Sequence, residues 1–194
     1  MHDEVMVRQW LSHRADRRCT TAIDMLLRTM TEDLAVAVGE AVTVRELSAD
    51  GLLLTPLAAH HVDPERGRAM ATMMQATVDK ADRGLWGPVI EQRRPVRWWM
   101  RPGDAPAEAS PQQATFLAHN PIRAILGVPL LWDELVLGGL SIVRYSVDRP
   151  FDGGDEALAV AAAERIALTL HYRRTMRELN SRRPPPPPSS TPHP

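Results

Sequence analysis

The chain has 194 residues, of which 44% are apolar and 24% charged, and its formal net charge is −1. This length and composition fit one globular domain, and the near-zero charge gives no general argument for binding nucleic acid or an anionic membrane. The single cysteine, Cys19, excludes a disulfide within the chain and fits a reducing compartment.

The N-terminus and the apolar segments indicate where the protein works. Residues 1–4 are acidic and lack the basic start and apolar run of a signal peptide. No apolar stretch approaches the roughly 20 residues that a membrane-spanning helix needs. We therefore expect a cytoplasmic protein with no membrane partner.

Two helices are predicted at the start of the chain. Residues 3–15 have a weak amphipathic pattern, and we assign residues 1–17 to an N-terminal helical extension. From Ile23 to Val38, apolar residues share one helical face. Gly39 then stands where a glycine commonly ends a helix.

The next segment changes to the alternating period of strands. Residues 41–47 are β-branched and alternating, and residues 52–55 resume an extended run after a turn signal that ends in Asp50-Gly51. This pattern predicts a β-hairpin. Pro56 predicts that its second strand lies at a sheet edge or ends there.

The middle of the chain predicts short elements. Asp63 and Pro64 suit a helix start, and an apolar stripe follows at Met70, Met73, Met74 and Val78. A short helix is predicted over residues 86–90 and a short strand over residues 95–98. Residues 101–114 have no period, so we predict a loop whose length is typical of functional or mobile segments.

The last part predicts a second hairpin and a long helix. Strands are predicted over residues 125–132 and 135–145, around a turn at Asp133-Glu134. Asp152 and Asp155 suit the cap of a helix that runs to about Asn180. Residues 181–194 hold five consecutive prolines and predict a disordered or polyproline II tail.

Four segments in this order resemble the GAF domain family. Residues 42–57 resemble its first hairpin, and residues 84–97 (GLWGPVIEQRRPVR) resemble its G-x-x-G-x-V-x-x-x-x-x-P-V helix and strand. Residues 122–142 resemble the R-S-x-x-x-V-P-L strand with the turn and strand after it. Residues 151–158 resemble the F-x-x-x-D entry to the last helix. The resemblance covers about residues 20–172, and we assign residues 18–180 to one GAF-like domain.

The resemblance implies an α+β fold of the GAF-like, PAS-related type. A central antiparallel sheet of five or six strands is expected, with terminal helices on one face and loops and short helices over a pocket on the other. It implies that the protein senses a small molecule. Members of the family bind cyclic nucleotides, haem, bilins or oxo-acids, and some have no known ligand. We identify no cofactor. Dimers through the terminal helices are also implied.

His119 and Arg123 are the polar candidates for a ligand site, because they precede the central strand where GAF loops line the pocket. His119 is a ligand contact, a haem axial ligand or a solvated loop histidine. Arg123 either holds a carboxylate or phosphate or pairs with a local acid. Ala124 replaces the usual serine of the family pattern, which makes phosphate or cyclic-nucleotide binding less supported.

Trp86, Trp98 and Met74 are the apolar candidates for the same site. Together with Met70 and Met73 they form either one wall of a ligand pocket or ordinary core. Trp98 and Trp99 point in opposite directions if they belong to a strand, so at most one of them faces a pocket.

The sequence gives no support for catalysis. Related sulfoxide reductases use several loop cysteines, and thiol reduction needs a resolving thiol, whereas Cys19 stands alone and precedes the domain core. His60 and His61 are adjacent and would point to opposite faces of a strand, which makes a poor metal site. Gly138-Gly139 lies inside a strand and lacks a phosphate-loop context. We expect a regulatory protein rather than an enzyme, with no nucleic-acid partner.

The stripe on the last helix is the predicted dimer interface, unless that helix packs back on the N-terminal helix. Its members are Leu168, Tyr172, Met176 and Leu179. Two functions remain open: a small-molecule sensor that signals through a homodimer or a trans-acting partner, and an interaction module with a filled pocket. An enzyme of the sulfoxide-reductase type is a third and weaker alternative.

Overall fold

The computed structural model describes residues 21–76, 79–145 and 147–181. The first helix is described over residues 21–38. The other elements are β1 (Ala41–Leu47), β2 (Leu53–His60), α2 (Pro64–Ala76), β3 (Asp79–Lys80), α3 (Trp86–Gln92), β4 (Val96–Trp99), α4 (Pro111–His119), β5 (Ala124–Trp132), β6 (Leu135–Arg144) and α5 (Gly153–Ser181).

The strands form one antiparallel sheet in the order β3-β2-β1-β6-β5-β4. The hairpins β1–β2 and β5–β6 meet at its centre, where Thr43 lies opposite Ser141. β3 pairs only with Leu53 and Leu54, so β2 is at the edge of the sheet where Pro56 lies. Because a proline is tolerated in an edge strand, β2 continues through Pro56. The β1–β2 register shifts beside Pro56. Of the two predictions for this proline, the edge position is correct.

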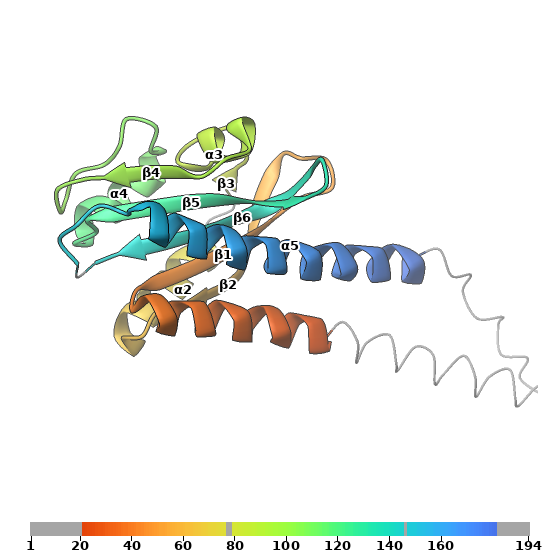
Figure 1. Ribbon diagram of the computed structural model, residues 1–194. Helices are drawn as coiled ribbons and strands as arrows, with labels where there is room; N and C mark the ends of the chain where they lie inside the picture. Colours follow the sequence, from red (N-terminus) through yellow and green to blue (C-terminus); the bar gives the residue numbers. More distant parts are fainter. Residues whose placement is uncertain (1–20, 77–78, 146, 182–194) are drawn as a thin grey trace, which may run out of the picture.

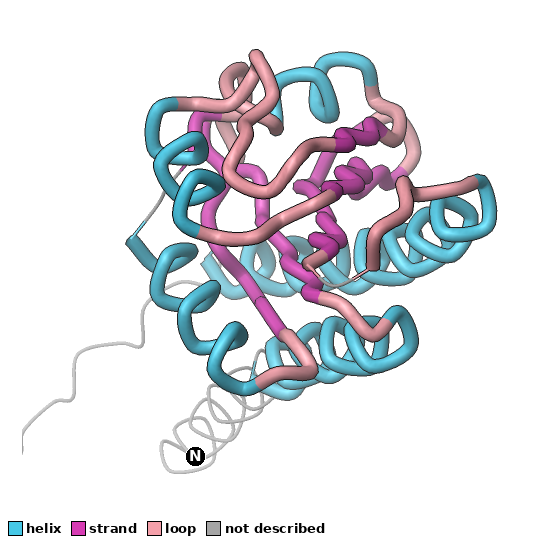
Figure 2. The backbone as a smooth tube through the Cα atoms, turned by 90° about the vertical axis from the view of Figure 1, so that its left-hand side faces the viewer, coloured by secondary structure: helices cyan, strands magenta, loops and turns pink. Residues whose placement is uncertain are grey.

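The sheet separates two apolar cores. Val42 and Val44 of β1 pack beneath the first helix and α5, whereas Ala41 and Leu47 pack on the opposite face with α2, α3 and α4. This division follows from the period of two along a strand. Figures 1 and 2 show the strand layer between the two terminal helices on one side and the shorter helices on the other.

The two terminal helices lie side by side and antiparallel on their face of the sheet (Figure 1). The hydroxyl of Thr169 on α5 lies 3.9 Å from the sulfur of Met30 on the first helix. Gly39 ends the first helix with a φ of +67°, as predicted. The prediction for the start of α5 is also confirmed, because Asp152 accepts from the amide of Asp155 at 2.9 Å while the Asp155 carboxylate accepts from the amide of Asp152 at 3.0 Å.

The predicted loop over residues 101–114 is wrong at its end, because α4 begins at Pro111. Ser110 and Gln113 form a reciprocal capping box in which each side chain accepts from the other residue's amide. This serine, three residues before a glutamine and directly before a proline, was the signal for a helix start. The two-residue strand β3 was also not predicted. The predicted helix at 3–15, Cys19, Val78 and residues 182–194 lie outside the described residues.

Candidate functional site

A cavity of about 90 Å³ lies between the sheet and the helices α2, α3 and α4. One buried water needs roughly 10–15 Å³ of such space, so the cavity has room for several waters or one small organic molecule. Strand residues of one face form its floor, including Thr43, Arg45, Ser141 and Val143. The hydroxyls of Thr43 and Ser141 form a hydrogen bond of 2.7 Å across the β1–β6 pair.

Large apolar side chains cover the cavity. α2 contributes Met70, Met73 and Met74, which share a helical face because they are three and four residues apart. Trp86 at the start of α3 and Phe116 of α4 complete this cover. Thioether and aromatic side chains make an adaptable wall of the kind that small organic ligands occupy.

Gly127 and Gly139 make room for the indole rings at the cavity. A Cβ at Gly139 would lie 2.7 Å from Cε3 of Trp86, and one at Gly127 would lie 3.3 Å from Cζ3 of Trp98 and 2.7 Å from Cγ2 of Val89. Glycine at these strand positions therefore lets aromatic rings pack directly on the sheet backbone. Gly139, which has no phosphate-loop context in the sequence, has this steric role.

The amide of Gln113 joins α3 and α4 at the cavity. Its Oε1 accepts from the backbone amide of Leu85 at 2.9 Å and from that of Ser110 at 3.0 Å. Gly84 leaves space for this side chain, because a Cβ there would lie 3.0 Å from the Gln113 Cδ. The φ of +64° at Gly84 also favours glycine.

A buried ion pair gives the cavity its charged end. Nη2 of Arg45 lies 3.1 Å from Oδ2 of Asp79, and the two side chains are 5% and 8% exposed. Nη1 of Arg45 donates to the carbonyl of Leu54 at 3.5 Å. Burial lowers the pKa of Arg45 and raises the pKa of Asp79, and in each case the partner's charge opposes the effect of burial.

Three of the predicted site residues lie together at this cavity: Trp86, Trp98 and Met74 all line it. Trp98 is 8% exposed and Trp99 is 49% exposed, which confirms that the two rings point in opposite directions. Their contact with a ligand stays a prediction.

The two predicted polar residues, His119 and Arg123, are not among the residues that line the cavity. His119 is exposed in the last turn of α4, where its Nδ1 lies 2.7 Å from the carbonyl oxygen of Thr115. Nη1 of Arg123 contacts Oδ1 of Asp148 at 2.9 Å. His119 is therefore an exposed helix residue and Arg123 is paired with a local acid, and a ligand contact of either residue stays a prediction.

The sequence patterns do not indicate the polar residues that line the cavity, which are Thr43, Arg45, Asp79, Gln112, Gln113 and Ser141. One signal was available, since Arg45 interrupts a β-branched strand on the same face as Thr43. Asp79 gave no such signal, because only the pairing of β3 with β2 brings it to Arg45.

No helix among the described residues is long and apolar enough to cross a membrane. The described residues also contain no group of three or more His, Cys, Asp or Glu side chains that could hold a metal ion. His61 is buried, and its Nδ1 accepts a hydrogen bond from the amide of Asp63 at 2.8 Å.

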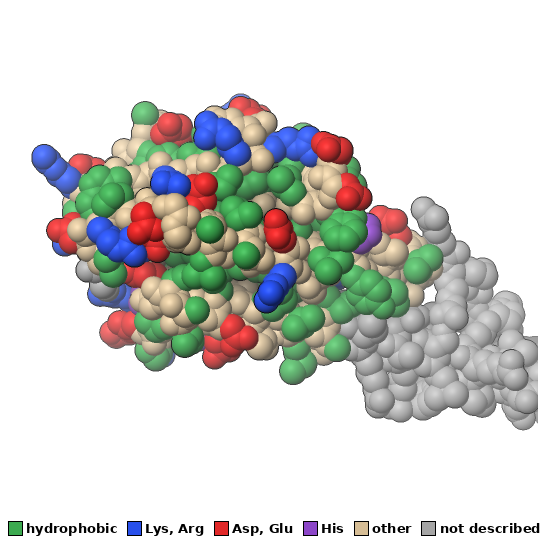
Figure 3. All heavy atoms as spheres, in the orientation of Figure 1, with side chains coloured by type: hydrophobic (Ala, Val, Ile, Leu, Met, Phe, Trp, Pro, Cys, Tyr) green, Lys and Arg blue, Asp and Glu red, His purple; other side chains and the backbone are tan. Residues whose placement is uncertain are grey.

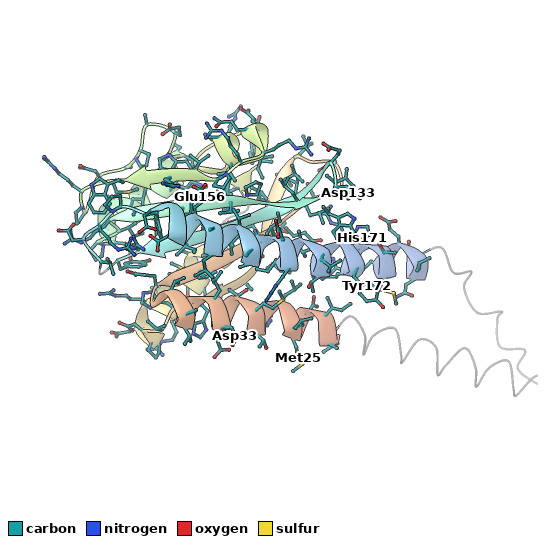
Figure 4. All side chains as sticks on the ribbon, in the orientation of Figure 1. Met25, Asp33, Asp133, Glu156, His171 and Tyr172 are labelled. Carbon is teal, nitrogen blue, oxygen red and sulfur yellow. The ribbon has the colours of Figure 1, made fainter. Side chains whose placement is uncertain are left out.

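The predicted interface stripe on α5 is mostly exposed. Leu168, Tyr172 and Leu179 are 50%, 51% and 58% exposed, whereas Met176 is half-buried. Met25 on the neighbouring first helix is 65% exposed. Figure 3 shows apolar side chains gathered on this face of the helix pair, and Figure 4 shows Met25 and Tyr172 on the two helices that carry them.

Comparison with known proteins agrees with this architecture. Residues 20–170 match the profile of the GAF domain family. The GAF domain of a phosphoenolpyruvate-protein phosphotransferase from Coxiella burnetii is similar in structure, with a TM-score of 0.63, 18% identity, and coverage of 85% of this chain and 94% of that one. A GAF domain/HD domain protein from Geobacter sulfurreducens gives a TM-score of 0.66 at 14% identity, with coverage of 80% and 96%.

An enzyme also shares the fold. A type II free methionine-R-sulfoxide reductase from Thermoplasma acidophilum is similar with a TM-score of 0.53 and 13% identity, and the match covers 77% of this chain and 96% of that one. At these identities the likeness shows the fold alone. With a family profile that spans most of the chain and a sheet flanked by terminal helices on one face, the chain belongs to the GAF domain family.

Proposed function

We propose that this domain is a sensory module that binds a small molecule in the cavity between the sheet and α2–α4. The observation that carries the proposal is the cavity itself, which combines an apolar lining with a few convergent polar groups. This combination is typical of ligand sites. GAF domains are in general regulatory and sensory, which agrees with this choice.

Binding rather than catalysis is the proposed activity. One protein of the same fold is a free methionine-R-sulfoxide reductase. That chemistry needs a thiol that attacks and a second thiol that resolves, whereas this sequence has Cys19 alone.

Tryptophan signals offer a direct test of the binding proposal. We expect isoamyl alcohol, a small neutral probe, to shift the indole NMR signals of Trp86 and Trp98, which line the cavity. The exposed Trp99 serves as an internal control. The variant Met73→Phe should fill the cavity and abolish the shifts, whereas Met25→Phe, far outside the cavity lining, should keep them. If neither this probe nor the three charged probes described below changes the signals of Trp86 and Trp98 in the native protein, the proposal is refuted.

We also infer a homodimer formed through the terminal helices. The exposed apolar side chains of α5 and the first helix support it, because contiguous apolar surface of this kind marks interaction sites. A trans-acting signalling partner on the same face is the alternative occupant. The interaction module with a filled pocket is less supported, since the cavity retains about 90 Å³.

A further inference from the structure

The charged end of the cavity restricts the chemistry of its ligand, given the binding function proposed above. Arg45 and Asp79 both line the cavity, and their charged atoms lie 3.1 Å apart. Both side chains are almost fully buried. A ligand that reaches this end therefore meets a positive and a negative group side by side.

Net charge is the first criterion. A buried charge without a partner is costly, and the Arg45–Asp79 pair is already balanced. A ligand with a single carboxylate could form an ion pair with Arg45, but it would bring a second negative charge beside Asp79. A ligand with a single ammonium could form an ion pair with Asp79, but it would bring a second positive charge beside Arg45. A ligand that carries both groups, close together, adds no net charge.

Hydrogen-bonding capacity permits such a ligand to bind without separating the pair. A guanidinium has five N–H donors in a planar fork, so it can contact Asp79 and a ligand carboxylate at the same time. Arg45 contacts the Oδ2 atom of Asp79. The carboxylate of Asp79 has two oxygens and accepts several hydrogen bonds when ionised, so it can also receive a ligand ammonium.

The size and the apolar lining of the cavity restrict the remaining part of the ligand. Beyond the charged end, the lining consists largely of methionine, tryptophan and aliphatic side chains, among them Met74, Trp86 and Ile125. With roughly 10–15 Å³ for each water-sized group, the cavity takes a molecule of about six to nine such groups. This size suits the side chain of valine, leucine or methionine and excludes that of tryptophan.

We propose that the cavity binds a free α-amino acid with a medium-sized apolar side chain. Arg45 holds its carboxylate, Asp79 holds its ammonium, and the apolar wall of α2 and α3 contacts its side chain.

Four matched probes test this proposal by calorimetry and by the indole signals of Trp86 and Trp98. L-leucine carries both charges, isocaproate lacks the ammonium, isoamylamine lacks the carboxylate, and isoamyl alcohol is neutral. We expect L-leucine to bind at least tenfold more tightly than each of the other three. A preference of less than tenfold over any of the other three would overturn the zwitterion proposal.

Removal of the ion pair supplies the second test. The double variant Arg45→Met with Asp79→Leu replaces both charges by apolar groups, a change that buried pairs often tolerate. It should lose the preference for L-leucine and still bind isoamyl alcohol. The control Arg123→Met with Asp148→Leu removes an ion pair outside the cavity lining and should bind L-leucine as the native protein does. If the double variant is unfolded by circular dichroism, Asp79→Asn replaces it and should weaken L-leucine but not isoamyl alcohol.

The outcomes separate this inference from the proposed function. If isoamyl alcohol shifts Trp86 and Trp98 but L-leucine shows no advantage, the cavity is a binding site and the zwitterion proposal is wrong. If none of the four probes moves these signals, both proposals fall. If the ion-pair variant keeps a tenfold preference for L-leucine, the assignment of Arg45 and Asp79 is wrong.

Discussion

Arg45 and Glu46 are consecutive residues of β1, and their side chains lie on opposite faces of the sheet. Arg45 lines the cavity beneath α2–α4. Glu46 faces the terminal helices, where its carboxylate contacts Arg173 at 2.6 Å and Arg174 at 3.2 Å. Arg173 also contacts Asp24 of the first helix at 2.8 Å. One short stretch of backbone therefore connects the cavity with both terminal helices.

Replacement of Glu46 by glutamine should destabilise the domain strongly. The Glu46 side chain is 14% exposed and balances the charges of Arg173, which is 7% exposed, and of Arg174. Its loss removes the carboxylate that contacts Arg174 and leaves Arg173 with Asp24 alone, and we expect a decrease of about 2–3 kcal/mol in the free energy of unfolding. Urea denaturation measures it. The control Glu134→Gln, at a 94% exposed side chain, should change the value by less than about 0.5 kcal/mol.

Substitution of Gly139 by alanine should disturb the site through Trp86. The new Cβ would lie 2.7 Å from Cε3 of that indole, so the ring must move. Overpacking of this kind typically costs about 1–3 kcal/mol. We expect a lower melting temperature and a changed indole signal of Trp86. At Gly153, where a Cβ would meet nothing within 4 Å, alanine should leave both unchanged or slightly raise the melting temperature.

Substitution of two adjacent glutamines of α4 should change the free energy of unfolding by clearly different amounts. Gln113→Ala removes the acceptor for the amides of Leu85 and Ser110, and we expect a loss of about 1–2 kcal/mol in unfolding free energy. Gln112 is exposed, so Gln112→Ala should stay within about 0.5 kcal/mol of the native protein. Equal effects of the two variants in urea denaturation would contradict the role given to Gln113.

Low pH should decrease the free energy of unfolding through protonation of His61, which lies between β2 and α2. Burial, aided by the charge of Arg66 and opposed by Asp63 and Glu40, lowers the pKa of His61 below its ordinary value of 6.5. A group with a lowered folded-state pKa binds fewer protons than in the unfolded chain. The contribution of neutral His61 is therefore complete above pH 6.5 and is lost as pH falls from 6.5 through the folded-state pKa.

Unfolding free energies at a series of pH values measure this effect. For a single proton the slope cannot exceed about 1.4 kcal/mol per pH unit. The variant His61→Asn should lose the His61 part of the slope below pH 6.5. His60→Asn, at the neighbouring half-buried position, should keep it. A slope that is the same in His61→Asn and in the native protein would show that another group causes it.

Charges placed on the α5 stripe should dissociate the proposed dimer. Leu168→Glu and Tyr172→Glu bring carboxylates to exposed positions that would become buried between two copies. Analytical ultracentrifugation should give a dimer for the native protein and a monomer for each variant. Leu158→Glu, at a 45% exposed position nearer the start of α5, should remain dimeric. A native protein that is monomeric at high micromolar concentration contradicts the dimer.

Local sequence patterns predict most of the helices, strands and turns. The apolar face from Ile23 to Val38, the hairpin turns and the cap at Asp152 each act over a few residues, so the periodicity and turn signals predicted them. The alternation of strands also predicted that Trp98 and Trp99 point in opposite directions. Where local prediction failed, as at α4, the capping box of Ser110 and Gln113 was still present in the sequence.

The polar part of the site depends on contacts between segments that are far apart in the chain. Thr43 meets Ser141 because β1 and β6 pair in one register, and Arg45 meets Asp79 because β3 adds two residues to the sheet edge. Arg123, which the resemblance indicates as a ligand-site candidate, contacts Asp148 and is not among the residues that line the cavity. A local pattern indicates which face of a strand is buried, but it does not specify which distant strand becomes its partner.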